Sequence, residues 1–145
     1  MNKYLPTSAA LVAAAVFLVC GSAYAVKVAN AINVKVILTG AEETPPVTTT
    51  ASGGGTISIA ADHSVSGSIR TRGIDGTAAH IHVGGPGQSG PPIITLVKGA
   101  DGLWSVPPGS KLTDEQYASF RAGNLYVNVH SAEHKPGEIR AQLKR

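Results

Sequence analysis

Apolar and polar residues alternate along much of the chain beyond residue 30, with the period of two that is typical of β-strands. Segments rich in glycine, proline and threonine interrupt the alternation and indicate turns and loops. The pattern predicts strands over 32–38, 56–60, 65–71, 79–83, 93–97, 103–106, 125–130 and 137–143. Short strands separated by turns indicate an all-β fold, an antiparallel sandwich or barrel of about eight strands.

One segment, 113–122, predicts a short helix instead of a strand. Thr113 is a suitable N-cap, and Gln116 three residues later completes a capping box. Gly123 favours an end at that position.

The first 25 residues have the pattern of a secretory signal peptide. Lys3 precedes the apolar run Leu11–Cys20, and Ala23-Tyr24-Ala25 is an A-x-A cleavage pattern. Cleavage after Ala25 would leave one domain, 26–145, exported to the periplasm or the extracellular space with no membrane span. A lipoprotein signal ending at Cys20 and an uncleaved N-terminal anchor stay open as alternatives.

Composition narrows the class of partner. Lys3 is the only charged side chain in the predicted signal, so 11 of the 12 Lys and Arg stay against 9 Asp and Glu. This small positive charge is scattered, which argues against nucleic acid and leaves room for a small anionic partner. Cys20, the only cysteine, leaves with the signal, so the mature chain has neither a disulfide nor a thiol nucleophile.

Histidines carry the candidate chemistry. His80 and His82 are two residues apart, so they share the outward face of the predicted 79–83 strand, whereas Ile81 points to the core. His130 lies on the outward face of the 125–130 strand, and His134 follows in a loop. If the two strands are neighbours, three or four imidazoles converge on a mononuclear transition-metal site. The alternative is that the histidines are hydrogen-bonding residues on a strand face.

Arg140 is expected to face outward on the last strand, beside the His130 loop. Its guanidinium could attract an anion to a metal site, because it is always charged and offers a fork of donors. An exposed arginine, or one paired with Glu138 or Glu133, is an equally good interpretation.

The sequence resembles the CHRD domain, a module named after chordin and common in bacterial exported proteins. The resemblance spans about 34–143, and it is carried by Leu38–Pro46, Ala78–His82, Gly87–Pro91, Tyr126–Ser131 and Gly137–Leu143. Ala141 stands where the family usually has glycine, and Lys135-Pro136-Gly137-Glu138 replaces a common P-G-G-E run. As a CHRD domain, the chain could be a non-catalytic binding or structural module of the extracellular or periplasmic space.

A second resemblance is to copper/zinc superoxide dismutases, which are eight-stranded Greek-key sandwiches. His80, His82, His130 and Arg140 occur in the order of that family's copper ligands and anion-guiding arginine. This resemblance implies a Greek-key fold, a single copper or iron ion with His134 as a fourth ligand, and superoxide as the anion. The zinc ligands and the disulfide of that family have no counterpart here.

Overall fold

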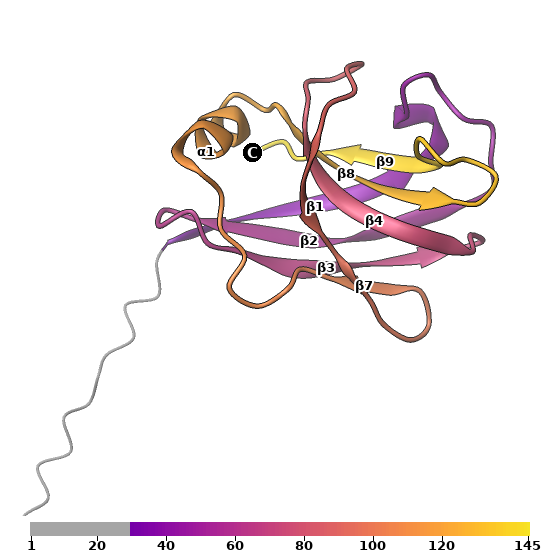
Figure 1. Cartoon of the computed structure of the whole chain (residues 1–145), viewed down its shortest axis with the longest axis horizontal. Coiled ribbons are helices and arrows are strands. Elements are labelled where there is room, and N and C mark those ends of the chain that lie inside the picture. Colours follow the sequence, from indigo (N-terminus) through magenta and orange to yellow (C-terminus); the bar gives the residue numbers. More distant parts are fainter. Residues whose placement is uncertain (1–29) are drawn as a thin grey trace, which may run out of the picture.

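The computed structural model describes residues 30–145, which form a nearly closed antiparallel β-barrel flattened into two layers (Figure 1). The predicted signal peptide lies outside the described residues. The elements are β1 (Ala31–Thr39), η1 (Gly40–Glu42), β2 (Ser52–Ala60), β3 (Val65–Arg72), β4 (Gly76–Val83), β5 (Pro92–Thr95), β6 (Val97–Lys98), β7 (Leu103–Ser105), α1 (Asp114–Arg121), β8 (Leu125–Ser131) and β9 (Ile139–Gln142).

The strands follow one another in the order β5-β4-β8-β9-β1-β2-β3-β7-β6. Strands β5 and β6 stand at opposite ends of this order, but they are consecutive in the chain. Because β5 pairs with β4 and β6 pairs with β7, this segment connects the two edges of the sheet. Strand β8 then returns across the molecule to lie beside β4. The spatial order β8, β4, β5–β6, β7 is a Greek key, which confirms the predicted fold class.

The inward-facing aliphatic residues of both layers form a single core. Leu38, Ile57, Ile81 and Val127 have no exposed surface. Residues two apart share a face, so the alternation in the sequence places one face of every long strand in the core.

Two of the differences from the predicted strands have a clear physical cause. Strand β2 begins at Ser52 rather than at residue 56, because Gly53–Gly55 pair with both β1 and β3 although glycine gives no strand signal. The predicted 93–97 strand is broken at Leu96, whose N–H still donates to the Ala79 carbonyl. The break lets the chain leave β4 and reach β7.

Helix α1 has the predicted capping box. The Thr113 hydroxyl accepts from the Gln116 N–H, and the Gln116 side chain accepts from the Thr113 N–H. Phe120 anchors the helix in the core with no exposed surface. Among residues 30–145, no helix has the length and apolar character needed to cross a bilayer.

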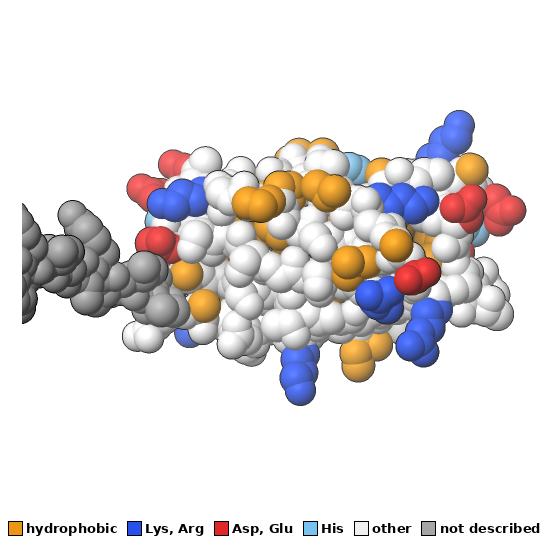
Figure 2. Space-filling model, turned by 90° about the horizontal axis from the view of Figure 1, so that it is seen from below, with side chains coloured by type: hydrophobic (Ala, Val, Ile, Leu, Met, Phe, Trp, Pro, Cys, Tyr) orange, Lys and Arg blue, Asp and Glu red, His pale blue; other side chains and the backbone are white. Residues whose placement is uncertain are grey.

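One side of the molecule, seen in Figure 2, carries its Lys and Arg side chains singly or in small groups among uncharged residues. Asp and Glu gather mainly toward the two ends of this view. This side therefore presents no continuous basic surface.

Candidate metal centre

The outer faces of β4, β8 and β9 form a second buried layer, which is polar. We call it the polar layer, and it comprises His80, His82, Tyr126, Asn128, His130, Arg140 and Gln142. The alternation assigned these residues to the correct face, and in the structure this face is covered rather than open to solvent. Tyr126 is 3% exposed, and Asn128 and Arg140 are each 1% exposed.

The loop 84–91 covers the polar layer, and two side chains of β9 hold it in place. Arg140 donates from Nη1 to the Gln88 carbonyl and from Nη2 to the Gly85 carbonyl, both at 2.9 Å. Gln142 donates from Nε2 to the Gly84 carbonyl at 2.8 Å. These carbonyls are partly or fully buried and need donors, so the donors that β9 supplies hold this loop against the polar layer.

Arg140 also packs against an aromatic ring. Its guanidinium carbon lies 3.5 Å from the Tyr126 ring centroid, and the Tyr126 ring stacks on His82 with centroids 4.7 Å apart. Strand β8 lies between β4 and β9, so the three groups stack in strand order. The predictions of an exposed arginine and of pairing with Glu138 or Glu133 were wrong, because this layer is covered and carbonyls hold the guanidinium.

Three of the four predicted ligands converge. Register places Ala78 opposite His130 and His80 opposite Asn128, so His80, His82 and His130 are neighbours on one face. Each offers one ring nitrogen to a group in which all three nitrogens lie within 4.8 Å of one another. His80 Nδ1 and His130 Nε2 are 2.9 Å apart. The two strands are therefore paired, as the metal-site hypothesis requires.

Backbone carbonyls fix the tautomers of two of these rings. His82 Nδ1 lies 2.8 Å from the Gly90 carbonyl, and His130 Nδ1 lies 2.8 Å from the Lys135 carbonyl. A carbonyl only accepts, so both Nδ1 atoms carry a proton and, in the neutral rings, both Nε2 atoms are acceptors. The Nε2 of His130 accepts from His80 Nδ1. Metal-ligating histidines are typically held in this way by a second hydrogen bond.

A family model for the CHRD domain matches residues 34–143. This chain belongs to the CHRD domain family. No curated protein and no solved structure matches it. All three converging histidines of this CHRD domain lie within the matched range.

Burial makes two histidines of the CHRD domain, His80 and His82, weaker bases than a free imidazole. Partial burial lowers the pKa of His80, and the neighbouring His130 and His82 lower it further. Burial likewise lowers the pKa of His82, where the charge of Arg140 adds a smaller effect. Both rings are therefore neutral at pH 7, which is the form that binds metal.

His134 does not join the group. Its backbone N–H donates to the Ser131 hydroxyl, and its carbonyl accepts from the Gly137 N–H. These bonds close a turn between β8 and β9, and the described residues of the metal-ligand group are His80, His82 and His130 alone. The structure thus gives no support to His134 as the fourth ligand.

The sequence did not predict a role for Glu43 and Asn128, which meet at the polar layer. Glu43, from the segment after β1, is 7% exposed and accepts a long hydrogen bond of 3.4 Å from Asn128 Nδ2. Burial raises the pKa of Glu43. Asn128 Oδ1 and His82 Nε2 are both buried without a partner among the described residues. Glu43 lies in the 38–46 motif that carried the CHRD resemblance, and this was the available signal for it.

Proposed function

We propose that this CHRD domain binds one transition-metal ion, copper or iron, through His80, His82 and His130. The observation that carries the proposal is the buried Nε2 of His82. No hydrogen bond to it forms among residues 30–145, although the Asn128 side chain is near enough to affect the pKa of this ring. His82 also supplies one of the three converging imidazole nitrogens. A buried polar atom without a partner costs free energy, and a bound ion would remove that cost.

The donor set fits such an ion. Ligand nitrogens at about 2.0 Å from a tetrahedral ion lie about 3.3 Å apart, close to the 2.9 Å between His80 Nδ1 and His130 Nε2. A proton now bridges these two nitrogens, and a shared ion would take its place. Imidazole suits copper and iron, and copper stands highest in the usual affinity order. Three protein ligands leave a further coordination position for water or substrate.

Superoxide dismutation is the finer proposal. A bound copper or iron ion would supply the one-electron chemistry, and the chain would supply neutral imidazoles and a positive field. Both terminal nitrogens of Arg140 already donate to carbonyls, so Arg140 would attract an anion through its field rather than by binding it. A superoxide assay on metal-loaded protein tests this step after metal binding itself.

A non-catalytic module is the second candidate, and the loop contacts favour it. The Gly90 and Lys135 carbonyls that orient His82 and His130 belong to covering segments, so the histidines also pin those segments. Under this alternative the chain takes up no metal, and His80→Ala changes stability alone.

Metal uptake by the untagged protein separates the two candidates. The chain is equilibrated with copper(II) or iron(II) near pH 7.5, excess metal is removed, and the bound metal is measured by elemental analysis. We expect one equivalent in the wild type and in His63→Ala, a histidine that stacks on Tyr117 outside the group. His80→Ala and His130→Ala should lose it. Equal uptake by all four proteins, or no uptake by any, contradicts the proposal.

Export is the expected setting. CHRD domains are typical of extracellular proteins. The A-x-A pattern predicts cleavage after Ala25. N-terminal sequencing of protein from its native compartment checks this. A first residue of Val26 would support cleavage, and an intact Met1 would favour a retained anchor.

A further inference from the structure

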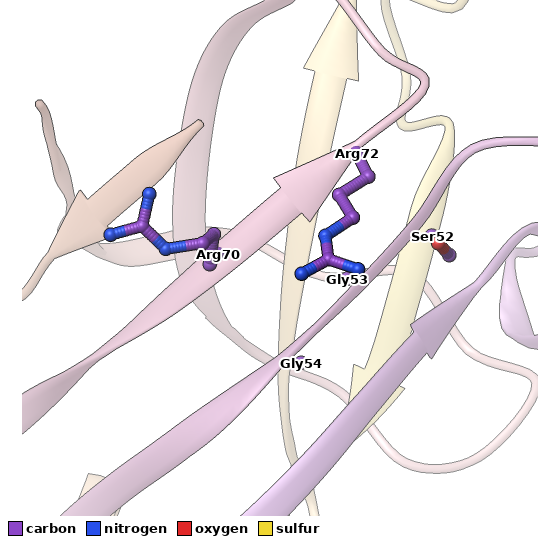
Figure 3. Close-up of a pocket in the computed structure, with 5 residues that line it drawn as sticks. All are labelled: Ser52, Gly53, Gly54, Arg70 and Arg72. Atoms are coloured by element: carbon purple, nitrogen blue, oxygen red, sulfur yellow. The ribbon is translucent and has the colours of Figure 1, made fainter. Parts of the chain in front are cut away.

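Away from the histidines, the outer face of β2 and β3 carries two arginines beside a run of glycines. Arg70 pairs in register with Gly54, and Arg72 pairs with Ser52. With Gly53, these residues line a shallow hollow of about 280 Å³. Figure 3 shows the Arg72 side chain extending across to β2, while Arg70 leans the other way. In this view the Arg72 guanidinium lies beside Gly53, whereas the Arg70 guanidinium lies on the far side of β3 from the glycines.

The charge in this hollow has no counter-charge. Neither of the two ion pairs among residues 30–145 involves these arginines, and no acidic side chain lines the hollow. Arg70 Nη1 donates to the Asp101 backbone carbonyl at 2.6 Å, which fixes the guanidinium without neutralising it. Arg72 is exposed. Two positive groups, one already held in place, therefore face solvent together.

Packing explains the inward Gly55 of this run but not the outward Gly54. A Cβ at Gly55 would overlap the Ser68 carbonyl of β3, so glycine is required there. A Cβ at Gly54 would meet only the Val36 carbonyl, at 3.3 Å, and would otherwise project into the hollow. Glycine weakens a strand interior, and where packing does not demand it, it often marks a close approach by a ligand.

We propose that this hollow, lined by Ser52, Gly54, Arg70 and Arg72, binds a phosphate-type oxyanion. Guanidinium forks match phosphate oxygens, and the Ser52 hydroxyl would add a neutral donor. The anion is either free inorganic phosphate or the phosphate group of an ester. Ile37, which is 76% exposed and pairs with Gly54 from β1, would contact the apolar body of an ester. The site is independent of the histidine centre.

Titration of the full chain with inorganic phosphate and with phenyl phosphate, followed by amide NMR at constant ionic strength, tests this. We expect saturable shifts confined to 52–54 and 70–72, and about tenfold weaker binding in Arg72→Gln, the cost of one charge-assisted contact. Gly54→Ala should also weaken binding without changing charge, whereas Lys35→Gln, a charge lost from neighbouring β1, should not. Shifts that stay linear with concentration, or equal effects of Arg72→Gln and Lys35→Gln, overturn the proposal.

The two probes separate the sources of phosphate. Tighter binding of phenyl phosphate that is lost in Ile37→Ser identifies an ester, and equal or tighter binding of inorganic phosphate identifies the free ion. Either result supports the site, and binding of neither probe overturns it.

Discussion

The two layers of the barrel have outer faces that look alike in sequence and differ in structure. On β3, the outward Arg70 and Arg72 are exposed. On β9, the outward Arg140 is 1% exposed. Both strands alternate, so the difference lies in the connections. The loop 84–91 covers the β9 face, and no such loop lies over the β3 arginines.

This difference shows that covering a polar face fixes the orientations of its side chains. Under the loop, donors and acceptors must be paired, so each side chain is held in one orientation and histidine tautomers become fixed. On the bare face, water supplies the partners, and side chains stay available to soluble ligands. The covered face therefore suits a preorganised metal centre.

Replacing the covered arginine should have the largest effect. Arg140→Met keeps much of the side-chain volume but leaves the Gln88 and Gly85 carbonyls without their donor. We expect a loss of about 3 kcal/mol in unfolding free energy, measured by urea denaturation. The matched change Arg72→Met on the bare face should cost no more than about 0.5 kcal/mol. Similar losses in both variants would erase the contrast between the faces.

Gly137→Ala should come next. Gly137 has a φ of +142°, and a Cβ there would overlap both Glu43 Oε1 and Asn128 Nδ2 in the polar layer. We expect a loss of about 2 kcal/mol from backbone strain and displaced neighbours. Gly109, with a φ of +80° and no atom near its Cβ position, isolates the strain alone. Gly109→Ala should therefore cost about 1 kcal/mol, and an equal cost at both positions would argue against a tightly packed polar layer.

A single hydrogen bond offers a finer test. The Tyr126 hydroxyl accepts from the Gly90 N–H at 3.2 Å under the loop, whereas Ser58 donates to Asn33 Oδ1 at 2.6 Å on the bare face. Tyr126→Phe should lower the unfolding free energy by about 1 kcal/mol, because the partly buried Gly90 N–H loses its acceptor and the Gly90 carbonyl loses a weak donor at 3.4 Å. Ser58→Ala should cost about 0.3 kcal/mol, since water replaces the partner. A larger loss of unfolding free energy in Ser58→Ala than in Tyr126→Phe would contradict the contrast between the two faces.

The smallest expected effect is a pH dependence of the metal-free protein. The pKa values of His80 and His82 are lowered in the folded state, so the unfolded chain binds more protons below its ordinary histidine pKa of about 6.5. Stability should therefore fall as pH drops below about 6.5 toward the folded-state values. Thermal melts between pH 7.5 and 5 measure this, and His82→Gln should flatten the slope. Rising stability toward pH 5 would contradict the lowered pKa values.

Much of the fold could be predicted from the sequence because local signals and tertiary structure agree. Strand alternation assigned the core face, and Thr113 and Gln116 set the start of the helix. The strand extension through Gly53–Gly55 escaped prediction because glycine has no side chain with which to signal a pairing made on both sides. The family motifs identified the CHRD domain over nearly its full extent.

The site was predicted less completely. The alternation along each strand placed His80, His82 and His130 on outward faces. Their convergence depends on the pairing of β4 with β8, a contact between segments about 50 residues apart. The alternation tells which face of the sheet a side chain is on, but not whether a loop covers that face, so it did not predict the burial of Arg140. His134 was placed by proximity in sequence, and the group of converging nitrogens among the described residues does not include it.

Counting the nitrogen ligands of the bound ion tests the central claim most directly. Copper(II) is added to one equivalent, and the complex is studied by electron paramagnetic resonance and X-ray absorption. Coordination by three imidazoles, lost in His130→Ala and unchanged in His134→Ala, is the predicted result. A copper spectrum without imidazole ligands, or one changed by His134→Ala but not by His130→Ala, would contradict the account.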